Sequence, residues 1–184
     1  MMVTVIGGSG SGKSEYAENL IKELAGSMDG NNKLYYIATM KPYGREAAER
    51  INRHQKLRAG KGFITVECYD NIEKCQLDSK SNVLLECMSN LAANEMFGNG
   101  IRDKKTVYHK ICKGIDRLKG IASNLVVVTN DIFCDGIIYD KSTMEYIELL
   151  GMANRYLAKV SGQVIEVIYS CPVIVANQEA HICH

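Results

Sequence analysis

Short apolar runs alternate along the chain with longer segments in which apolar residues recur every three or four positions. The runs predict strands and the periodic segments predict helices. We expect strands at Val3–Ile6, Lys33–Ala38, Phe63–Val66, Asn82–Glu86, Leu125–Thr129, Val164–Tyr169 and Val173–Val175. We expect helices at Lys13–Ala25, Arg45–Leu57, Asp103–Lys119 and Ser142–Val160, a further helix that ends near Phe97, and a weak one at Asn71–Cys75.

The alternation of strands and helices indicates the fold class. Strands that are apolar throughout are typical of a mostly parallel sheet with helices on both faces. The last two predicted strands are too close in sequence for a crossover helix, so they should form an antiparallel edge. The chain has two prolines and no low-complexity tract that would mark a linker. We therefore predict that residues 1–184 form a single α/β domain.

Composition limits the partners and the compartment. The formal net charge is +1, so no global field favours nucleic acid or an anionic membrane. No apolar run approaches the roughly 20 residues that span a bilayer, and we expect no cleavable signal peptide, because a predicted strand and then the glycine-rich segment follow Met2 directly. The seven cysteines include no C-x-x-C pair. This pattern favours reduced thiols and a cytoplasmic protein.

One segment contains a complete phosphate-binding motif. The pattern G-x-x-x-x-G-K-[ST] is matched between a predicted strand and a predicted helix by Gly7, Gly8, Ser9, Gly10, Ser11, Gly12, Lys13 and Ser14. Its backbone N–H groups can turn toward phosphate oxygens, and the helix adds the positive end of its dipole. Lys13 should reach the β- and γ-phosphates, and Ser14 should bind magnesium. The motif predicts a P-loop NTPase fold, RecA-like in its sheet, that binds a purine nucleoside triphosphate.

A carboxylate that could complete a magnesium site follows a neighbouring apolar strand. Val83, Leu84 and Leu85 lead directly into Glu86. P-loop proteins hold magnesium with an acid at such a strand end, and a charge is rarely left there without a partner. We therefore expect Ser14 and Glu86 to hold magnesium. A glutamate that faces solvent would give the same pattern.

The predicted helix at residues 45–57 is strongly basic. Arg50, His54 and Arg58 recur every four residues, so they share one helical face. Neighbouring cations favour a neutral imidazole, which could attack phosphorus while the guanidinium groups stabilise the charge on its oxygens. A solvated basic face with an incidental histidine explains the same pattern, and charge runs are more often of that kind. The residues alone leave both interpretations open.

Several further segments, taken in order, resemble one enzyme family. They are Tyr36–Thr39, Ala48–His54, Thr65–Glu67, Val83–Cys87, Asn94–Phe97, Val127–Asp131 and Gly151–Ala158. Together with the phosphate-binding motif, they resemble the bifunctional adenosylcobinamide kinase / adenosylcobinamide-phosphate guanylyltransferase family of cobalamin biosynthesis over nearly the whole length. After the histidine, that family usually has Arg-Pro and Trp, whereas here Phe63 takes the aromatic place.

The resemblance implies two reactions on a corrinoid. In the first, the γ-phosphate of ATP or GTP moves to the aminopropanol hydroxyl of adenosylcobinamide. In the second, GMP from GTP is attached to a histidine and passed to adenosylcobinamide phosphate, which gives adenosylcobinamide-GDP. Family members form homo-oligomers, often trimers, so the resemblance implies the same here.

The resemblance also implies roles for individual residues. His54 matches the histidine that carries GMP, and Lys13, Arg50 and Arg58 are the further catalytic candidates. The positions that fall where the family contacts GTP are Ala38, Thr39, Met40, Gln55, Lys56, Leu57, Arg58, Glu67 and Glu86.

Two other functions remain open. One is a P-loop kinase that acts on another small metabolite, in which His54 only helps to bind phosphate. The other is a GTP-binding switch without transferase chemistry. A switch should have N-K-x-D after an apolar strand, whereas Thr129-Asn130-Asp131-Ile132 lacks the lysine.

Overall fold

A seven-stranded sheet forms the centre of the computed structural model, which describes residues 1–26, 33–98, 100, 102–132, 136–137 and 139–178 apart from the side chains of residues 46, 47, 50, 54 and 57. The strand order is β3-β2-β4-β5-β1-β6-β7. All neighbouring pairs are parallel except β6 and β7, which are antiparallel as predicted. The strands are β1 (Met2–Gly7), β2 (Leu34–Ala38), β3 (Ile64–Glu67), β4 (Ser81–Glu86), β5 (Ala122–Asn130), β6 (Gln163–Ile168) and β7 (Cys171–Asn177).

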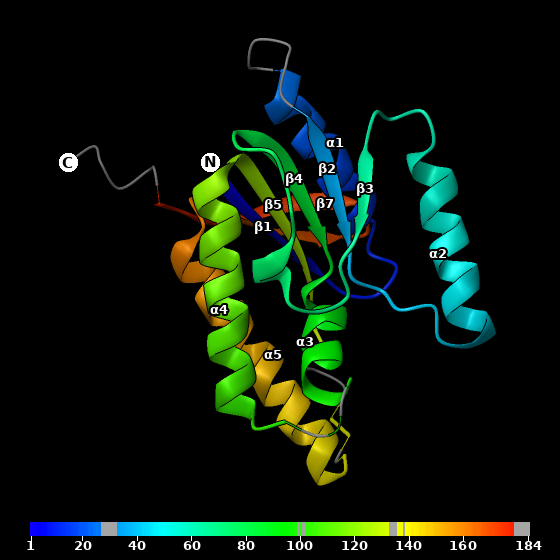
Figure 1. Cartoon of the computed structure of the whole chain (residues 1–184), viewed down its shortest axis with the longest axis vertical. Coiled ribbons are helices and arrows are strands. Elements are labelled where there is room, and N and C mark those ends of the chain that lie inside the picture. The colour runs from blue at the N-terminus through cyan, green and yellow to red at the C-terminus, as the bar shows by residue number, and fades with distance from the viewer. Residues whose placement is uncertain (27–32, 99, 101, 133–135, 138, 179–184) are drawn as a thin grey trace.

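Helices cover both faces of the sheet. They are α1 (Lys13–Gly26), α2 (Gly44–Arg58), α3 (Met88–Phe97), α4 (Lys104–Ile121) and α5 (Lys141–Val160), with a single 3-10 turn, η1 (Ile72–Lys74). Helices α3, α4 and α5 pack on one face and α1 on the other. Helix α2 stands beside β3, apart from the other helices (Figure 1). The described helices include none that is long and apolar enough to cross a bilayer.

Strand β4 shows how the pattern of the sequence builds the two-sided core. Val83 and Leu85 pack in the cluster that includes α3, α4 and α5, whereas Leu84 packs with Ile21 of α1. Successive side chains of a strand point to opposite faces, and all three β4 residues are fully buried. Burial of such a side chain stabilises the fold by about 1.5–3 kcal/mol. A continuous apolar run is therefore required where helices cover both faces.

The structure differs from the prediction at some boundaries. Strand β5 begins at Ala122, not at Leu125, because its polar start finds partners: Asn124 Nδ2 donates to Asn82 Oδ1 of β4 at 2.9 Å. Strand β7 is longer than the predicted Val173–Val175. The weak helix predicted at Asn71–Cys75 is only the 3-10 turn η1.

Candidate functional site

The Gly7–Ser14 segment joins β1 to α1 as a tight loop, here called the P-loop. Within it, the Ser11 N–H donates to the Gly8 carbonyl oxygen at 3.3 Å. The buried Lys13 ammonium donates to the same oxygen at 2.9 Å. Burial is the main cause that lowers the pKa of Lys13. A desolvated cation at a helix N-terminus is well suited to bind an anion.

Two later parts of the chain hold the P-loop from outside. Ser170, in the turn between β6 and β7, donates its N–H to the Ser11 carbonyl oxygen at 2.8 Å, and Asp131 after β5 donates its N–H to Gly7 O at 3.2 Å. Gly12 has a φ of 88°, and a Cβ there would lie 2.5 Å from Ser170 Oγ. Only glycine fits this position without strain. The shape of the P-loop therefore depends on these contacts as well as on its own residues.

The end of β4 brings a carboxylate to the P-loop. The Ser14 hydroxyl donates to Glu86 Oε1, and the Tyr36 hydroxyl donates to Glu86 Oε2 at 2.8 Å. Burial raises the pKa of Tyr36, and the charge of Glu86 raises it further, so the phenol stays a donor. Magnesium prefers oxygen ligands and commonly takes one carboxylate together with phosphate oxygens and water. The hydroxyl of Ser14 and the carboxylate of Glu86 fit that donor set.

A pocket adjoins Glu86, between α2 and the ends of β2, β3 and β4; we call it the α2 pocket. Several residues predicted to bind the nucleotide line it: Ala38, Met40, Gln55, Arg58, Glu67 and Glu86. The other wall residues are Tyr36, Ile51, Thr65, Tyr69, Cys87 and Asn90. A second hollow continues past Gln55 and Arg58 to Phe63. Because Glu86 contacts Ser14 and also lines the pocket, the P-loop and the α2 pocket are contiguous.

Arg58 anchors the C-terminal end of α2 at this pocket. Its side chain is buried, and its Cζ lies 3.5 Å from the centroid of the Tyr36 ring. The ring of Phe63 packs edge-on against Tyr36, with centroids 5.9 Å apart. A desolvated cation–π contact contributes about 2 kcal/mol. Just beyond the helix, Lys61 forms an ion pair of 2.5 Å with the buried carboxylate of Glu18 in α1. The end of α2 is thus joined both to the sheet and to α1.

Among the predicted nucleotide-binding residues outside the P-loop whose side chains are described, Thr39 and Lys56 do not line the α2 pocket. Thr39 is fully buried; its hydroxyl donates to the Cys87 carbonyl oxygen at 2.9 Å and accepts from the Cys87 N–H at 2.7 Å. It therefore joins the ends of β2 and β4. Lys56 is exposed on α2 and is not among the wall residues.

The predicted residues Arg50, His54 and Leu57 belong to α2, but their side chains lie outside the described residues. Ile51 and Arg58 both line the α2 pocket. In a helix, residues separated by three, four or seven positions share a face. Backbone position 54 therefore falls in the stripe that Ile51 and Arg58 mark.

A regular spacing connects some of the wall residues that were not expected from the sequence with residues that were. Tyr36 lies two positions before Ala38, and Thr65 and Tyr69 lie two positions on either side of Glu67. Alternate residues of a strand face the same side. Extending the named positions by two along β2 and β3 would have found Tyr36 and Thr65, whereas Tyr69 lies in the bend that follows β3.

Comparison with known proteins identifies the family of the chain. Residues 3–175 match the family model described as cobinamide kinase / cobinamide phosphate guanyltransferase. The bifunctional adenosylcobalamin biosynthesis protein CobU of Escherichia coli (strain K12) is 26% identical over 177 residues, which cover 89% of this chain and 93% of the relative. The protein of the same name from Salmonella typhimurium (strain LT2) is 27% identical, with the same coverage of both chains. Because this family model matches nearly the whole chain, the chain belongs to the cobinamide kinase / cobinamide phosphate guanyltransferase family.

Proposed function

We propose that this enzyme phosphorylates adenosylcobinamide with ATP or GTP and then transfers GMP from GTP to adenosylcobinamide phosphate through a guanylylated His54. Family membership supports both activities. One structural observation carries the proposal: Glu86 contacts Ser14 in the P-loop and also lines the α2 pocket. A nucleotide whose phosphates occupy the P-loop would extend toward the stripe of α2 that contains position 54.

The guanylyl transfer has two steps. The unprotonated imidazole nitrogen of His54 attacks the α-phosphorus of GTP, the bond from that phosphorus to the bridging oxygen breaks, and pyrophosphate leaves. The imidazolium formed in this way releases its proton. A phosphate oxygen of adenosylcobinamide phosphate then attacks the same phosphorus, the P–N bond breaks, and the histidine takes a proton back. The covalent intermediate divides one difficult transfer into two easier ones.

The kinase step uses the same P-loop on a different phosphorus. The corrinoid hydroxyl attacks the γ-phosphorus, loses its proton and releases ADP or GDP. Lys13 offsets the negative charge on the β- and γ-phosphates, and Arg58 and Arg50 stabilise the charge around the α-phosphorus in the other reaction. Ser14 and Glu86 hold magnesium, which neutralises charge on the phosphate oxygens when it is bound.

The remaining parts of the proposal concern GTP contacts and assembly. Ala38, Met40, Gln55 and Glu67 are proposed to contact GTP from the walls of the α2 pocket, and Thr39 supports the wall through its bonds to Cys87. A homo-oligomer and a cytoplasmic location stay predictions. Strand β7 supports the first, because its apolar side chains are exposed at the outer edge of the sheet.

The test follows label from GTP that carries a radioactive α-phosphate. The wild-type protein should retain label that is labile to acid and stable to alkali, as a phosphoramidate is, and His54→Ala should retain none. The matched control is His109→Ala, an exposed histidine of α4, which should label like the wild type. Absence of label on the wild type, or undiminished label on His54→Ala, would overturn the guanylyltransferase assignment.

A second arm uses γ-labelled ATP or GTP with adenosylcobinamide. Both wild type and His54→Ala should transfer this label, because the kinase step does not need the histidine. Transfer by a wild type that never takes up α-label would identify a kinase alone. A protein that binds GTP but transfers neither label would be a nucleotide-binding switch.

A further inference from the structure

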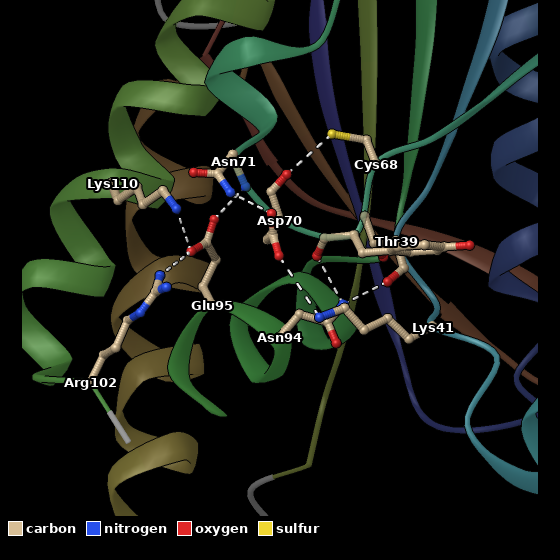
Figure 2. Close-up of polar contacts among 10 residues, drawn as sticks. Thr39, Lys41, Cys68, Asp70, Asn71, Asn94, Glu95, Arg102 and Lys110 are labelled. Carbon is tan, nitrogen blue, oxygen red and sulfur yellow. Dashed lines mark hydrogen bonds and ion pairs between the residues drawn. The ribbon is translucent and has the colours of Figure 1, made fainter. Parts of the chain in front are cut away.

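Helix α3 ties together two segments that wall the α2 pocket. Asn90 of α3 lines the pocket. One turn later, Asn94 Nδ2 donates to the Thr39 carbonyl oxygen at 2.8 Å and to the Tyr69 carbonyl oxygen at 2.9 Å (Figure 2). Thr39 follows β2 and Tyr69 lies shortly after β3. One amide group therefore bridges the carboxyl ends of two neighbouring strands.

One bridged carbonyl group belongs to a wall residue of the α2 pocket, and the other belongs to the residue that follows a wall residue. Tyr69 is a wall residue, and Ala38 immediately precedes Thr39. An amide NH₂ has two hydrogens, so each can serve one carbonyl, and the spacing of the two segments is limited to what a single nitrogen can span. The Lys41 ammonium and an Asp70 carboxylate oxygen, 3.8 Å apart, link the same segments a second time (Figure 2).

The next residue of α3 fixes the second segment more firmly. Glu95 is almost fully buried, and its Oε1 accepts from the Asn71 N–H at 2.6 Å. Its Oε2 accepts from Lys110 Nζ at 2.6 Å and from an Arg102 guanidinium nitrogen at 3.2 Å (Figure 2). A buried carboxylate that is paired with two cations resists displacement, since removal of one partner leaves an uncompensated charge. The segment after β3 is thereby held against α3 and α4.

We propose that Asn94 and Glu95 are positioning residues that set the width of the α2 pocket for the nucleoside part of GTP. Neither residue lines the pocket; they act through the two segments that they hold. The inference rests on the proposed function in one respect, namely that the nucleoside end of GTP enters this pocket while its phosphates occupy the P-loop. It adds a set of residues on α3 on which affinity for the nucleoside depends.

The central experiment compares two ligands on one variant. Asn94→Asp replaces two N–H donors with a carboxylate that faces two carbonyl oxygens, so the bridged segments should separate. Calorimetry should show GTP binding about tenfold weaker, because the separated walls fit the nucleoside less closely. Binding of inorganic tripolyphosphate, which has no nucleoside, should stay within about twofold of the wild type. In guanylylation, the same variant should raise KM for GTP with little change in kcat.

The matched control is a second asparagine whose amide bridges two segments. Asn124 Nδ2 donates to the Leu24 carbonyl oxygen at 3.3 Å and to Asn82 Oδ1 at 2.9 Å, at the end of the sheet away from the P-loop. Asn124→Asp should lower the melting temperature but leave the affinity of the folded protein for both ligands unchanged. A purely structural role of Asn94 would give this same result.

Glu95→Gln provides a second variant with nearly the same shape. It keeps an acceptor for Asn71 and loses the charge that holds Arg102 and Lys110, so a smaller GTP-specific loss of affinity is expected. The proposal is wrong if Asn94→Asp binds GTP like the wild type, if both ligands weaken equally, or if the wild type gains no affinity from the nucleoside. These outcomes are read from binding alone, so they are distinct from a failure of His54 to take up label.

Discussion

The P-loop and the α2 pocket adjoin each other at Glu86, but they draw on very different lengths of chain. The P-loop is one contiguous stretch, Gly7–Ser14, that is shaped by its own glycines and backbone hydrogen bonds and held by two backbone contacts, from Ser170 and Asp131. The walls of the α2 pocket come from β2, β3, β4, α2 and α3 and from the segments that follow the strands. Substitutions in the first region should therefore act mainly on phosphate binding. Substitutions around the second should act on nucleoside binding and on stability together.

Gly12→Ala should reduce ligand affinity more than any other substitution considered. It tests whether a change in the P-loop acts on phosphate binding. The added Cβ has to adopt a φ of 88° and lies 2.5 Å from Ser170 Oγ, so the loop has to move and its N–H groups lose their alignment. We expect affinity for tripolyphosphate and for GTP to fall together by about a hundredfold or more, equivalent to about 2.7 kcal/mol. Calorimetric titration measures both.

Gly120→Ala is the control for that substitution. Gly120 lies in α4 without a positive φ, and a methyl group added there would meet none of the described residues outside its own helix within 4 Å. Its affinities should match those of the wild type, and its stability should rise by about 0.5–1 kcal/mol, because alanine favours a helix over glycine. Equal affinities for Gly12→Ala and Gly120→Ala would show that the P-loop tolerates a side chain beside Ser170.

Two substitutions of Tyr36 test whether changes in the wall of the α2 pocket act on nucleoside binding and on stability together. Tyr36→Phe removes the hydrogen bond to Glu86 and should cost about 1 kcal/mol of unfolding free energy. Tyr36→Leu also removes the ring under Arg58 and beside Phe63, and should cost about 2–3 kcal/mol. Urea unfolding gives the stabilities. Affinity for GTP should fall in the same order, by about threefold and then tenfold, while affinity for tripolyphosphate changes little.

Two outcomes would contradict this prediction for Tyr36. If Tyr36→Leu is less stable but binds GTP as tightly as the wild type, the Arg58 contact belongs to the fold alone. If Tyr36→Phe weakens the binding of tripolyphosphate as much as that of GTP, Tyr36 acts on phosphate binding through Glu86 and Ser14. Its place in the wall of the α2 pocket would then matter less.

The smallest expected effect is the uptake of a proton by Lys13 when a ligand binds. It should be the same for tripolyphosphate and for GTP. Burial lowers the pKa of Lys13 in the free protein, and bound phosphate oxygens favour the charged amine and raise the pKa again. Between these two pKa values, binding takes up part of one proton, and affinity falls as pH rises; below both values there is no linkage. Titrations in two buffers of different ionisation enthalpy measure the uptake, which Lys13→Met should abolish.

The same linkage predicts the stability of the free protein at high pH. The unfolded chain keeps the ordinary lysine pKa of 10.5, so between the folded pKa and that value the unfolded state binds more protons. Stability against unfolding therefore rises with pH in that window as far as Lys13 is concerned. A proton release on binding, in place of uptake, would contradict this account of the P-loop cation.

The contrast between the P-loop and the α2 pocket also explains how much of the structure could be predicted from the sequence. The P-loop, the parallel sheet and the antiparallel edge follow from patterns within a few residues, and the structure confirms the fold class. The start of β5 was missed because Asn124 appears polar in sequence, although Asn82 satisfies its side chain one strand away. Side-chain pairing between distant segments leaves no periodic signal.

In the candidate site, the GTP contacts were expected from the family resemblance and stay predictions, although several of these residues line one pocket. Ala38, Glu67 and Glu86 are pocket residues, and period-two extension from Ala38 and Glu67 along their strands would have added Tyr36 and Thr65. Asn90 on α3 has no such signal, and Thr39 lies beside the pocket in a supporting position. Whether a polar residue faces a ligand or another backbone depends on packing that only the folded chain determines.

The position of β1 in the sheet has a consequence for the order in which the protein forms during translation. Strand β1 lies between β5 and β6, with Met2 opposite Leu125 and Val3 opposite Gln163. It leaves the ribosome long before either neighbour, and such distant pairings are slow to close. The P-loop also needs Ser170 as a partner for Ser11. A nascent chain that ends after α4 would thus contain the whole phosphate-binding motif without its binding site, so nucleotide cannot stabilise the chain until β6 and β7 have been made.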